Sequence, residues 1–327
     1  MSSQSASAVH DESSGLDVAE DIEWSSAGRI VASGFAMGSA DIVPGVSGGT
    51  MAVATGIYSE LLAAIASINL TTLTYLKRFD LSGALKTVHW RFLLSLFFGI
   101  GLAVVLMVKL VELPRLLVTN TSEVYAVFFG LVLASVWILG KSIAWNSGRF
   151  LALVAGAALG FAVVNLVPVD TPSNPLFMFA YGMIAISAML LPGISGSFIL
   201  LILGQYEVII GAIEDLIHLQ LGAFAIVLPF GLGCVFGITG FSRLVSWMLR
   251  KFHDPVVAAL TGLLLGSLWR IWPYQHTVTQ EVRGKLKTVE ATPYLPDSLE
   301  INILLLTLAG LGGVLLLEWI AGRRKLA

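Results

Sequence analysis

Two stretches of the sequence decide the fold: PGVSGGTMAVATGIYSELLAAI at residues 44–65 and PGISGSFILLILGQYEVIIGAI at residues 192–213. They align at an offset of 148 residues, and eight of the 22 aligned positions are identical. Most of the identities fall on Gly, Pro and Ser, which a merely apolar composition would not produce. The chain therefore contains an internal repeat.

The composition of the 327 residues indicates an integral membrane protein. Hydrophobic residues make up 56% of the chain and charged residues only 12%, whereas soluble domains carry about 25% charged residues. The runs at 92–108 and 301–317 contain no charged residue at all. A soluble enzyme is excluded, because so little polar surface cannot cover a water-soluble globule of this size.

The apolar segments divide into two groups of five, which we predict to be the two copies of the repeat, at 27–168 and 176–320. The ten segments lie at residues 28–43, 47–66, 92–111, 124–140, 150–168, 176–192, 195–213, 222–249, 255–272 and 301–320. Because five is odd, the second copy enters the membrane from the opposite face, and the halves are inverted. The acidic, Ser-rich residues 1–26 predict a disordered tail that precedes this single membrane domain.

The distribution of basic residues predicts the orientation. We place Arg323, Arg324 and Lys325, which follow the last apolar segment, in the cytoplasm. Counting the segments back along the chain then places further basic residues in the cytoplasm, namely Arg250, Lys251, Lys141, Arg149, Lys77, Arg78, Lys86 and Arg91. Segments 169–175 and 214–221, which are assigned to the outside, contain no Lys or Arg. The exception is the long loop 273–300, which is also assigned to the outside but contains basic residues. The positive-inside rule thus predicts a multi-pass protein of the cytoplasmic membrane with both termini in the cytoplasm.

The first two segments of each half lack a polar loop between them. Residues 28–66 stay apolar and are interrupted only by Pro-Gly and Ser-Gly. Broken backbone at membrane depth is tolerated only where protein or a water-filled cavity satisfies its polar groups. We therefore expect an all-α protein with two re-entrant helical hairpins, whose tips meet near the middle of the membrane.

The two PGxSG turns predict an anion site. A Pro ends the incoming helix, a Gly allows positive φ, and a Ser caps the next helix, whose first N–H groups are unpaired. Such helix starts bind phosphate. The predicted substrate-binding residues are Pro44, Gly45, Ser47, Gly48, Gly49, Thr50, Pro192, Gly193, Ser195, Gly196 and Ser197, with Arg243 and Arg270 as compensating cations. The alternative for the turns is a pair of bends that bind nothing. For the two arginines the alternative is that they lie near segment ends and extend their charged groups to the membrane surface.

Other charges and glycines in the apolar segments carry further predictions. Asp41, Glu60 and Glu207 lie close to the two turns, and we predict that they bind a proton or Na⁺, with interfacial carboxylates as the alternative for Glu60 and Glu207. The spacing of Gly231, Gly233, Gly237 and Gly240 predicts close helix packing. Because Cys234 is the single cysteine, we predict no intramolecular disulfide and no metal site. We also predict no cofactor and no nucleic-acid partner.

The motifs ADIVPGVSGGTMAVATGIYSELL and LLPGISGSFILLILGQYEVI resemble the signature repeats of the bacterial and archaeal polyprenyl-phosphate transporter family. The resemblance covers about residues 28–320. It implies a translocase that returns undecaprenyl phosphate from the outer to the inner leaflet, where this lipid carrier re-enters peptidoglycan and other cell-envelope synthesis. It does not extend to the acidic tail or to the loop 273–300, and oligomeric state stays open.

Three other functions fit part of the pattern. Both turns match the GxSG of rhomboid-type proteases, but all five histidines lie outside the apolar cores, so a Ser/His dyad lacks its base. Undecaprenyl pyrophosphate phosphatases have a similar PGxSRS motif, but Gly48 and Gly196 stand where that family has Arg. An anion channel could use the same helix ends. We therefore predict a transporter with no catalytic residue.

Overall fold

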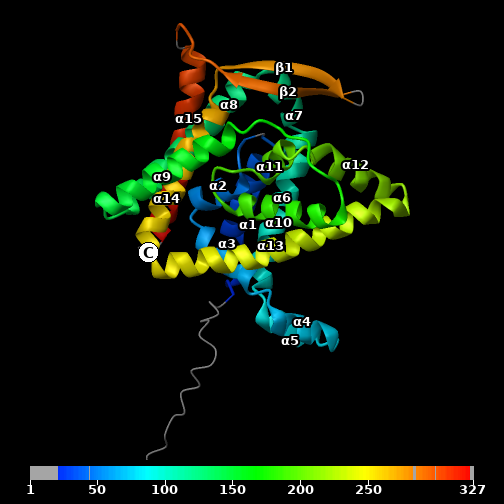
Figure 1. Cartoon of the computed structure of the whole chain (residues 1–327). Coiled ribbons are helices and arrows are strands. Elements are labelled where there is room, and N and C mark those ends of the chain that lie inside the picture. Colours follow the sequence, from blue (N-terminus) through cyan, green and yellow to red (C-terminus); the bar gives the residue numbers. More distant parts are fainter. Residues whose placement is uncertain (1–20, 44, 283–284, 299, 325–327) are drawn as a thin grey trace, which may run out of the picture.

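The computed structural model describes residues 21–43, 45–282, 285–298 and 300–324, and they form a mostly helical protein (Figure 1). The helices are α1 (Ala27–Asp41), α2 (Gly48–Ala54), α3 (Tyr58–Ala66), α4 (Leu70–Lys77), α5 (Leu81–Thr87), α6 (Trp90–Lys109), α7 (Leu113–Thr119), α8 (Thr121–Ser142), α9 (Ser147–Val164), α10 (Pro175–Leu190), α11 (Gly196–Ile202), α12 (Tyr206–Ile217), α13 (Phe224–Lys251), α14 (His253–Ser267) and α15 (Ile301–Arg324). Short 3-10 helices lie at Trp24–Ser26, Leu221–Ala223 and Leu268–Ile271.

The helices confirm the predicted all-α, polytopic membrane protein. Within the described residues, five helical stretches are long and apolar enough to cross a membrane: α6, α8, α9, α13 with its preceding 3-10 turn, and α14 with the 3-10 turn that follows it. The helices α10 and α15 carry shorter apolar stretches. Many large apolar side chains on these helices point outward, as lipid-facing residues do.

The two repeated motifs fold alike. Gly45 and Gly193 both have φ +87°, and Gly56 and Gly204 have φ +71° and +66°. Each motif therefore gives one turn before a seven-residue helix, α2 or α11, and a second turn after it. The axes of α11 and α12 differ by 110°, which is the geometry of a broken span or a re-entrant loop. How the two halves are inserted in the membrane remains a prediction.

Helix packing follows the same repeat. In the first half α6 packs along α1, and in the second half α13 packs along α10. The last two spans of each half pair across the halves, α8 with α15 and α9 with α14. These four pairs are the most extensive helix contacts in the described part of the chain.

Glycine allows these pairs to approach closely. A Cβ on Gly233 of α13 would collide with the carbonyl of Phe179 on α10, and one on Gly182 would collide with the carbonyl of Phe230. The other three pairs have equivalent contacts at Gly34 and Gly99, Gly130 and Gly310, and Gly156 and Gly262. The prediction of close packing is confirmed for Gly233 and Gly237 and is wrong for Gly231 and Gly240, around which there is open space.

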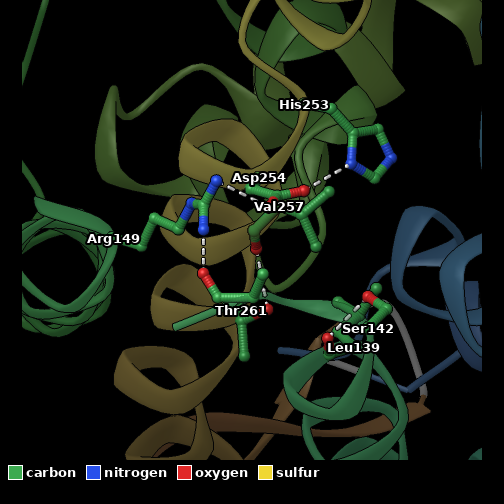
Figure 2. A network of polar contacts seen from close by, with 8 residues as sticks. Leu139, Ser142, Arg149, His253, Asp254, Val257 and Thr261 are labelled. Carbon is green, nitrogen blue, oxygen red and sulfur yellow. Dashed lines mark hydrogen bonds and ion pairs between the residues drawn. The ribbon is translucent and has the colours of Figure 1, made fainter. Parts of the chain in front are cut away.

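An ion pair joins the starts of α9 and α14. Figure 2 shows Arg149 and Asp254 facing one another, with an Nη2 to Oδ2 distance of 2.9 Å. Arg149 also donates to the carbonyl of Ala144, and His253 Nδ1 lies 3.1 Å from the other Asp254 oxygen. The ends of this helix pair are thereby fixed to each other and to the α8–α9 connection.

Several elements were not predicted from the sequence. The helices α4, α5 and α7 lie in segments assigned to connections, and the loop 273–300 contains an antiparallel pair, β1 (Gln275–Val282) and β2 (Lys285–Pro293). In Figure 1 the β pair and α7 lie at one end of the helical body, and α4 and α5 lie at the opposite end. Of the predicted tail, residues 1–20 lie outside the described residues, while Asp21 accepts hydrogen bonds from the N–H groups of Arg91 and Phe92 at the start of α6.

The helix contacts give a direct test. Gly233→Ala should lower the free energy of unfolding by about 1–3 kcal/mol, because the added methyl group forces α13 away from α10. The matched control is Gly231→Ala, two residues earlier on the same helix, where open space and better helix propensity predict no loss. Thermal unfolding of the two purified variants in detergent measures the difference. Equal melting temperatures would contradict the packing described here.

Candidate functional site

The two repeated turns lie against each other. The N–H of Gly193 donates to Thr50 Oγ1 at 2.9 Å, and the hydroxyl of Tyr58 donates to the Leu190 carbonyl at 2.9 Å. The hydroxyl of Ser47 donates to the Met189 carbonyl at 3.4 Å. Side chains of the first motif thus supply the partners that the broken backbone around the second turn needs. Residues about 140 positions apart in the chain are thereby brought into contact.

In the first turn, nearby side chains occupy the N–H groups. Ser47 is fully buried and caps α2, with its Oγ accepting from Gly49 N at 3.2 Å. The N–H of Gly48 donates to Asp41 Oδ1 at 2.7 Å. A Cβ on Gly48 would lie 2.7 Å from the other oxygen of Asp41, so the glycine lets the carboxylate approach. Pro44 lies outside the described residues.

The second turn is more open. The hydroxyls of Ser195 and Ser197 lie 2.8 Å apart, with Ser195 half-buried and Ser197 exposed. The position that matches Asp41 in the repeat is Met189, so no carboxylate stands at that place. Pro192 and Gly193 are buried, and a Cβ on Gly196 would lie 2.8 Å from the Ala185 carbonyl. The two turns share a backbone shape but differ in the groups that surround it.

Arg270 lies between the two motifs. It belongs to the 3-10 helix after α14 and is half-buried. A Cβ on Gly45 would lie 2.8 Å from Arg270 Cγ, and the guanidinium carbon lies 5.2 Å from the ring centroid of Phe198 in α11. The aliphatic part of this side chain therefore contacts the first turn, and its permanent positive charge lies beside the helix that follows the second turn.

Arg243 occupies a different place. It is exposed on α13, and its Nη2 donates to the carbonyl of Ile68 at 3.1 Å, between α3 and α4. The structure therefore brings Arg270, but not Arg243, to the turns. Sequence reasoning could not separate these two arginines, because both lie near the ends of apolar segments.

The three acidic residues predicted to bind a cation have different surroundings. Asp41 contacts the first turn, as described above. Glu60 forms a two-oxygen ion pair with Arg29, at 2.9 and 2.8 Å, on a partly exposed surface. Glu207 is exposed and lines a cavity of about 340 Å³ between α12 and the start of α13, with Asp215 and Gln220. Asp41 is thus in direct hydrogen-bond contact with the first turn.

Sequence reasoning missed the contacts of Tyr58 and Phe198. Tyr58 had a usable signal, because Tyr recurs at position 206 in the second motif. Phe198 replaces Thr50 in the repeat, and its cation–π contact depends on Arg270, 72 positions later in the chain. A contact between residues so far apart in the chain cannot be predicted from a local sequence pattern.

Comparison with known proteins identifies the family. A family model described as undecaprenyl phosphate translocase-like matches residues 37–288, which include both turns, Asp41 and Arg270. The chain belongs to this family. A polyprenyl-phosphate transporter of Vibrio cholerae serotype O1 is 42% identical over 252 residues, which are 77% of this chain and 79% of the relative. A polyprenyl-phosphate transporter of Staphylococcus aureus is 32% identical over 254 residues, 73% of this chain and 84% of the relative.

The family resemblance read from the two motifs is therefore confirmed. No solved structure matches the chain significantly. In this translocase-like family member, Ser47 caps α2 and donates to the Met189 carbonyl, and the hydroxyl of Ser195 bonds with that of Ser197. Neither arrangement resembles an activated nucleophile with its base.

The different positions of the two serines predict different effects of alanine. Ser47→Ala should lower the free energy of unfolding by about 1 kcal/mol, because it removes a helix cap and leaves the Gly49 N–H without its partner. Ser195→Ala should change stability by less than about 0.5 kcal/mol, because the hydrogen-bond partner of its half-buried hydroxyl is the exposed hydroxyl of Ser197. Thermal melting of both variants in one detergent provides the comparison, and the reverse order would contradict the cap.

Proposed function

We propose that this protein returns undecaprenyl phosphate from the outer to the inner leaflet of the cytoplasmic membrane, where the lipid carrier re-enters peptidoglycan and cell-envelope synthesis. The observation that carries the proposal is the 42% identity to a polyprenyl-phosphate transporter over 77% of this chain. The matching family model covers residues 37–288, which include both turns and Arg270. A mostly helical membrane protein with an internal repeat is the architecture expected of such a transporter.

The proposed phosphate site lies at the open second turn. The hydroxyls of Ser195 and Ser197 donate to phosphate oxygens, and Arg270 supplies a charge beside them. The glycines of the motif keep side chains away from the backbone that the phosphate approaches. The first turn contributes its N–H groups only after Asp41 has left Gly48, because one N–H cannot serve two anions fully.

The proposed coupling to a cation follows from the charge of the substrate. A phosphate of about −1.5 to −2 that moves toward a negative interior works against roughly 3.5–4.6 kcal/mol per 100 mV. A proton or Na⁺ that neutralises Asp41 releases the Gly48 N–H for the phosphate and travels inward with it. Asp41 is the preferred coupling residue because of its contact with the turn, while Glu60 already pairs with Arg29 and Glu207 lies beside a cavity of α12.

The proposed topology has two inverted halves, with both termini in the cytoplasm. It rests on the basic residues at 77–91 and 141–149 and on their absence from 169–175 and 214–221. Single cysteines placed in 69–91 and in 169–175 of a Cys234→Ser protein should react with an impermeant reagent from opposite sides of the membrane, the former from the cytoplasm. Labelling of both segments from one side would refute the inverted halves.

Transport by the purified protein in vesicles tests the function. The wild-type protein should move undecaprenyl phosphate between leaflets and should release no inorganic phosphate from undecaprenyl pyrophosphate. Arg270→Gln should slow transport about 10- to 100-fold, because a hydrogen bond to a charged group contributes roughly 1.5–3 kcal/mol. Arg243→Gln is the matched control and should retain most activity, since Arg243 contacts only the Ile68 carbonyl in the described structure.

The same vesicles separate the alternatives. Phosphate release would favour the phosphatase, and passage of inorganic anions without lipid movement would favour the channel. With imposed pH, Na⁺ and voltage gradients, Asp41→Asn should keep lipid movement but lose its response to the coupling gradient. If the wild-type protein responds to no gradient, it is a passive scramblase for this lipid, and the proposed coupling is wrong.

A further inference from the structure

The helices α4 and α5 form a hairpin that exposes large apolar side chains. Phe79 is 92% exposed, Leu81 66% and Leu85 49%. Figure 1 shows the two helices extending sideways from the lower end of the body and away from the other helices. The hairpin is too short and too polar to span a membrane. Side chains of this kind in open water would be unfavourable, so the hairpin needs an apolar surface beside it.

The hairpin is also basic. Lys77, Arg78 and Lys86 flank the exposed apolar residues, and Asp80 is the single acidic residue between positions 68 and 91. The carboxylate of Asp80 caps α5 by accepting from Gly83 N at 2.8 Å. The charge that the hairpin presents to its surroundings is therefore positive, next to apolar side chains, which is the pattern of an element that lies on an anionic membrane surface.

The attachment of the hairpin places it at the membrane surface. Three residues after α5 ends, Trp90 begins α6, and its ring packs edge-on against Trp24 at 5.6 Å between centroids. The guanidinium of Arg91 lies 5.6 Å from the Trp90 ring and 5.9 Å from the Trp24 ring. Tryptophan and arginine clustered at the start of a spanning helix mark the level of the lipid head groups, and the hairpin begins and ends beside this level.

The base of the hairpin is held firmly to the first motif. The hydroxyls of Thr72 and Thr87 lie 2.9 Å apart and join α4 to α5. Thr72 also donates to the Ser67 carbonyl at the end of α3, and Ser67 Oγ accepts from His89 N at 3.2 Å. The position of the hairpin is therefore fixed by buried hydrogen bonds and is not that of a free loop.

We propose that the α4–α5 hairpin is a docking element for anionic lipid head groups. Phe79, Leu81 and Leu85 enter the boundary between head groups and acyl chains, and Lys77, Arg78 and Lys86 contact lipid phosphates. The partner is the anionic bilayer itself, favoured by the positive charge, the exposed apolar tip and the neighbouring tryptophans. This proposal does not depend on which lipid the protein transports.

A fluorescent label at the tip tests the proposal in the full-length protein. The Cys234→Ser, Phe79→Cys variant, labelled with an environment-sensitive dye, is reconstituted in phosphatidylcholine alone or mixed with phosphatidylglycerol. Brominated acyl chains should quench the dye, and brominated phosphatidylglycerol should quench it more than brominated phosphatidylcholine in the mixed vesicles. A Leu219→Cys label is the matched control. Like Phe79, Leu219 is largely exposed, at 84%, and has a positive φ, but it lies in a connection without Lys or Arg.

Removal of the basic residues completes the test. Replacing Lys77, Arg78 and Lys86 by Gln in the Phe79→Cys protein should abolish most of the preference for phosphatidylglycerol, since each basic residue near the surface contributes up to about fivefold. Dye at position 79 that is quenched by a water-soluble quencher but not by lipid would overturn the proposal. Lipid quenching without any anionic preference would overturn the head-group contact.

Discussion

The lack of water in the bilayer core is the constraint on which this structure depends. A backbone N–H or carbonyl at a helix break in the membrane must find its partner in the protein or in a water-filled cavity. Around the second turn the partners come from the other half. The Thr50 hydroxyl accepts from the N–H of Gly193, and the hydroxyls of Tyr58 and Ser47 donate to the carbonyls of Leu190 and Met189. Because an unsatisfied buried group costs about 1–3 kcal/mol, the second break depends for its stability on side chains of the first motif. The first motif therefore has a structural role at the second turn before any ligand is considered.

The contacts between the turns are asymmetric although the motifs are duplicated. Thr50 and Gly193 form a direct hydrogen bond, whereas the equivalent pair, Phe198 and Gly45, is bridged by Arg270. Asp41 in the first half is likewise replaced by Met189 in the second. One turn therefore carries a carboxylate and the other lies beside a guanidinium. Under the proposed function, this difference gives the two halves different tasks, with cation response in the first turn and phosphate binding in the second.

The sequence was informative wherever the signal was local. Hydropathy predicted the apolar helices, and the repeated Gly, Pro and Ser predicted both turns, because positive φ and helix capping depend on single residues. Prediction from the sequence failed where contacts between distant segments decide the position of a side chain. Arg270 and Arg243 look alike in sequence, and only packing places the first beside Gly45 and the second on Ile68. The β1–β2 pair and the α4–α5 hairpin were missed because short polar elements give weak periodicity.

The charges around the turns connect substrate binding to the state of Asp41. Arg270 carries one positive charge, and each of the two helix starts is equivalent to up to about half a positive charge. Together they supply roughly two positive charges, which is close in magnitude to the negative charge of a phosphate. An ionised Asp41 cancels about half of that sum and also occupies the Gly48 N–H. Under the proposed function, phosphate should therefore bind well only when Asp41 is neutralised. On the proposed function, lipid and cation then load together, and the loaded site carries little net charge, which lowers the cost of its exposure to the membrane.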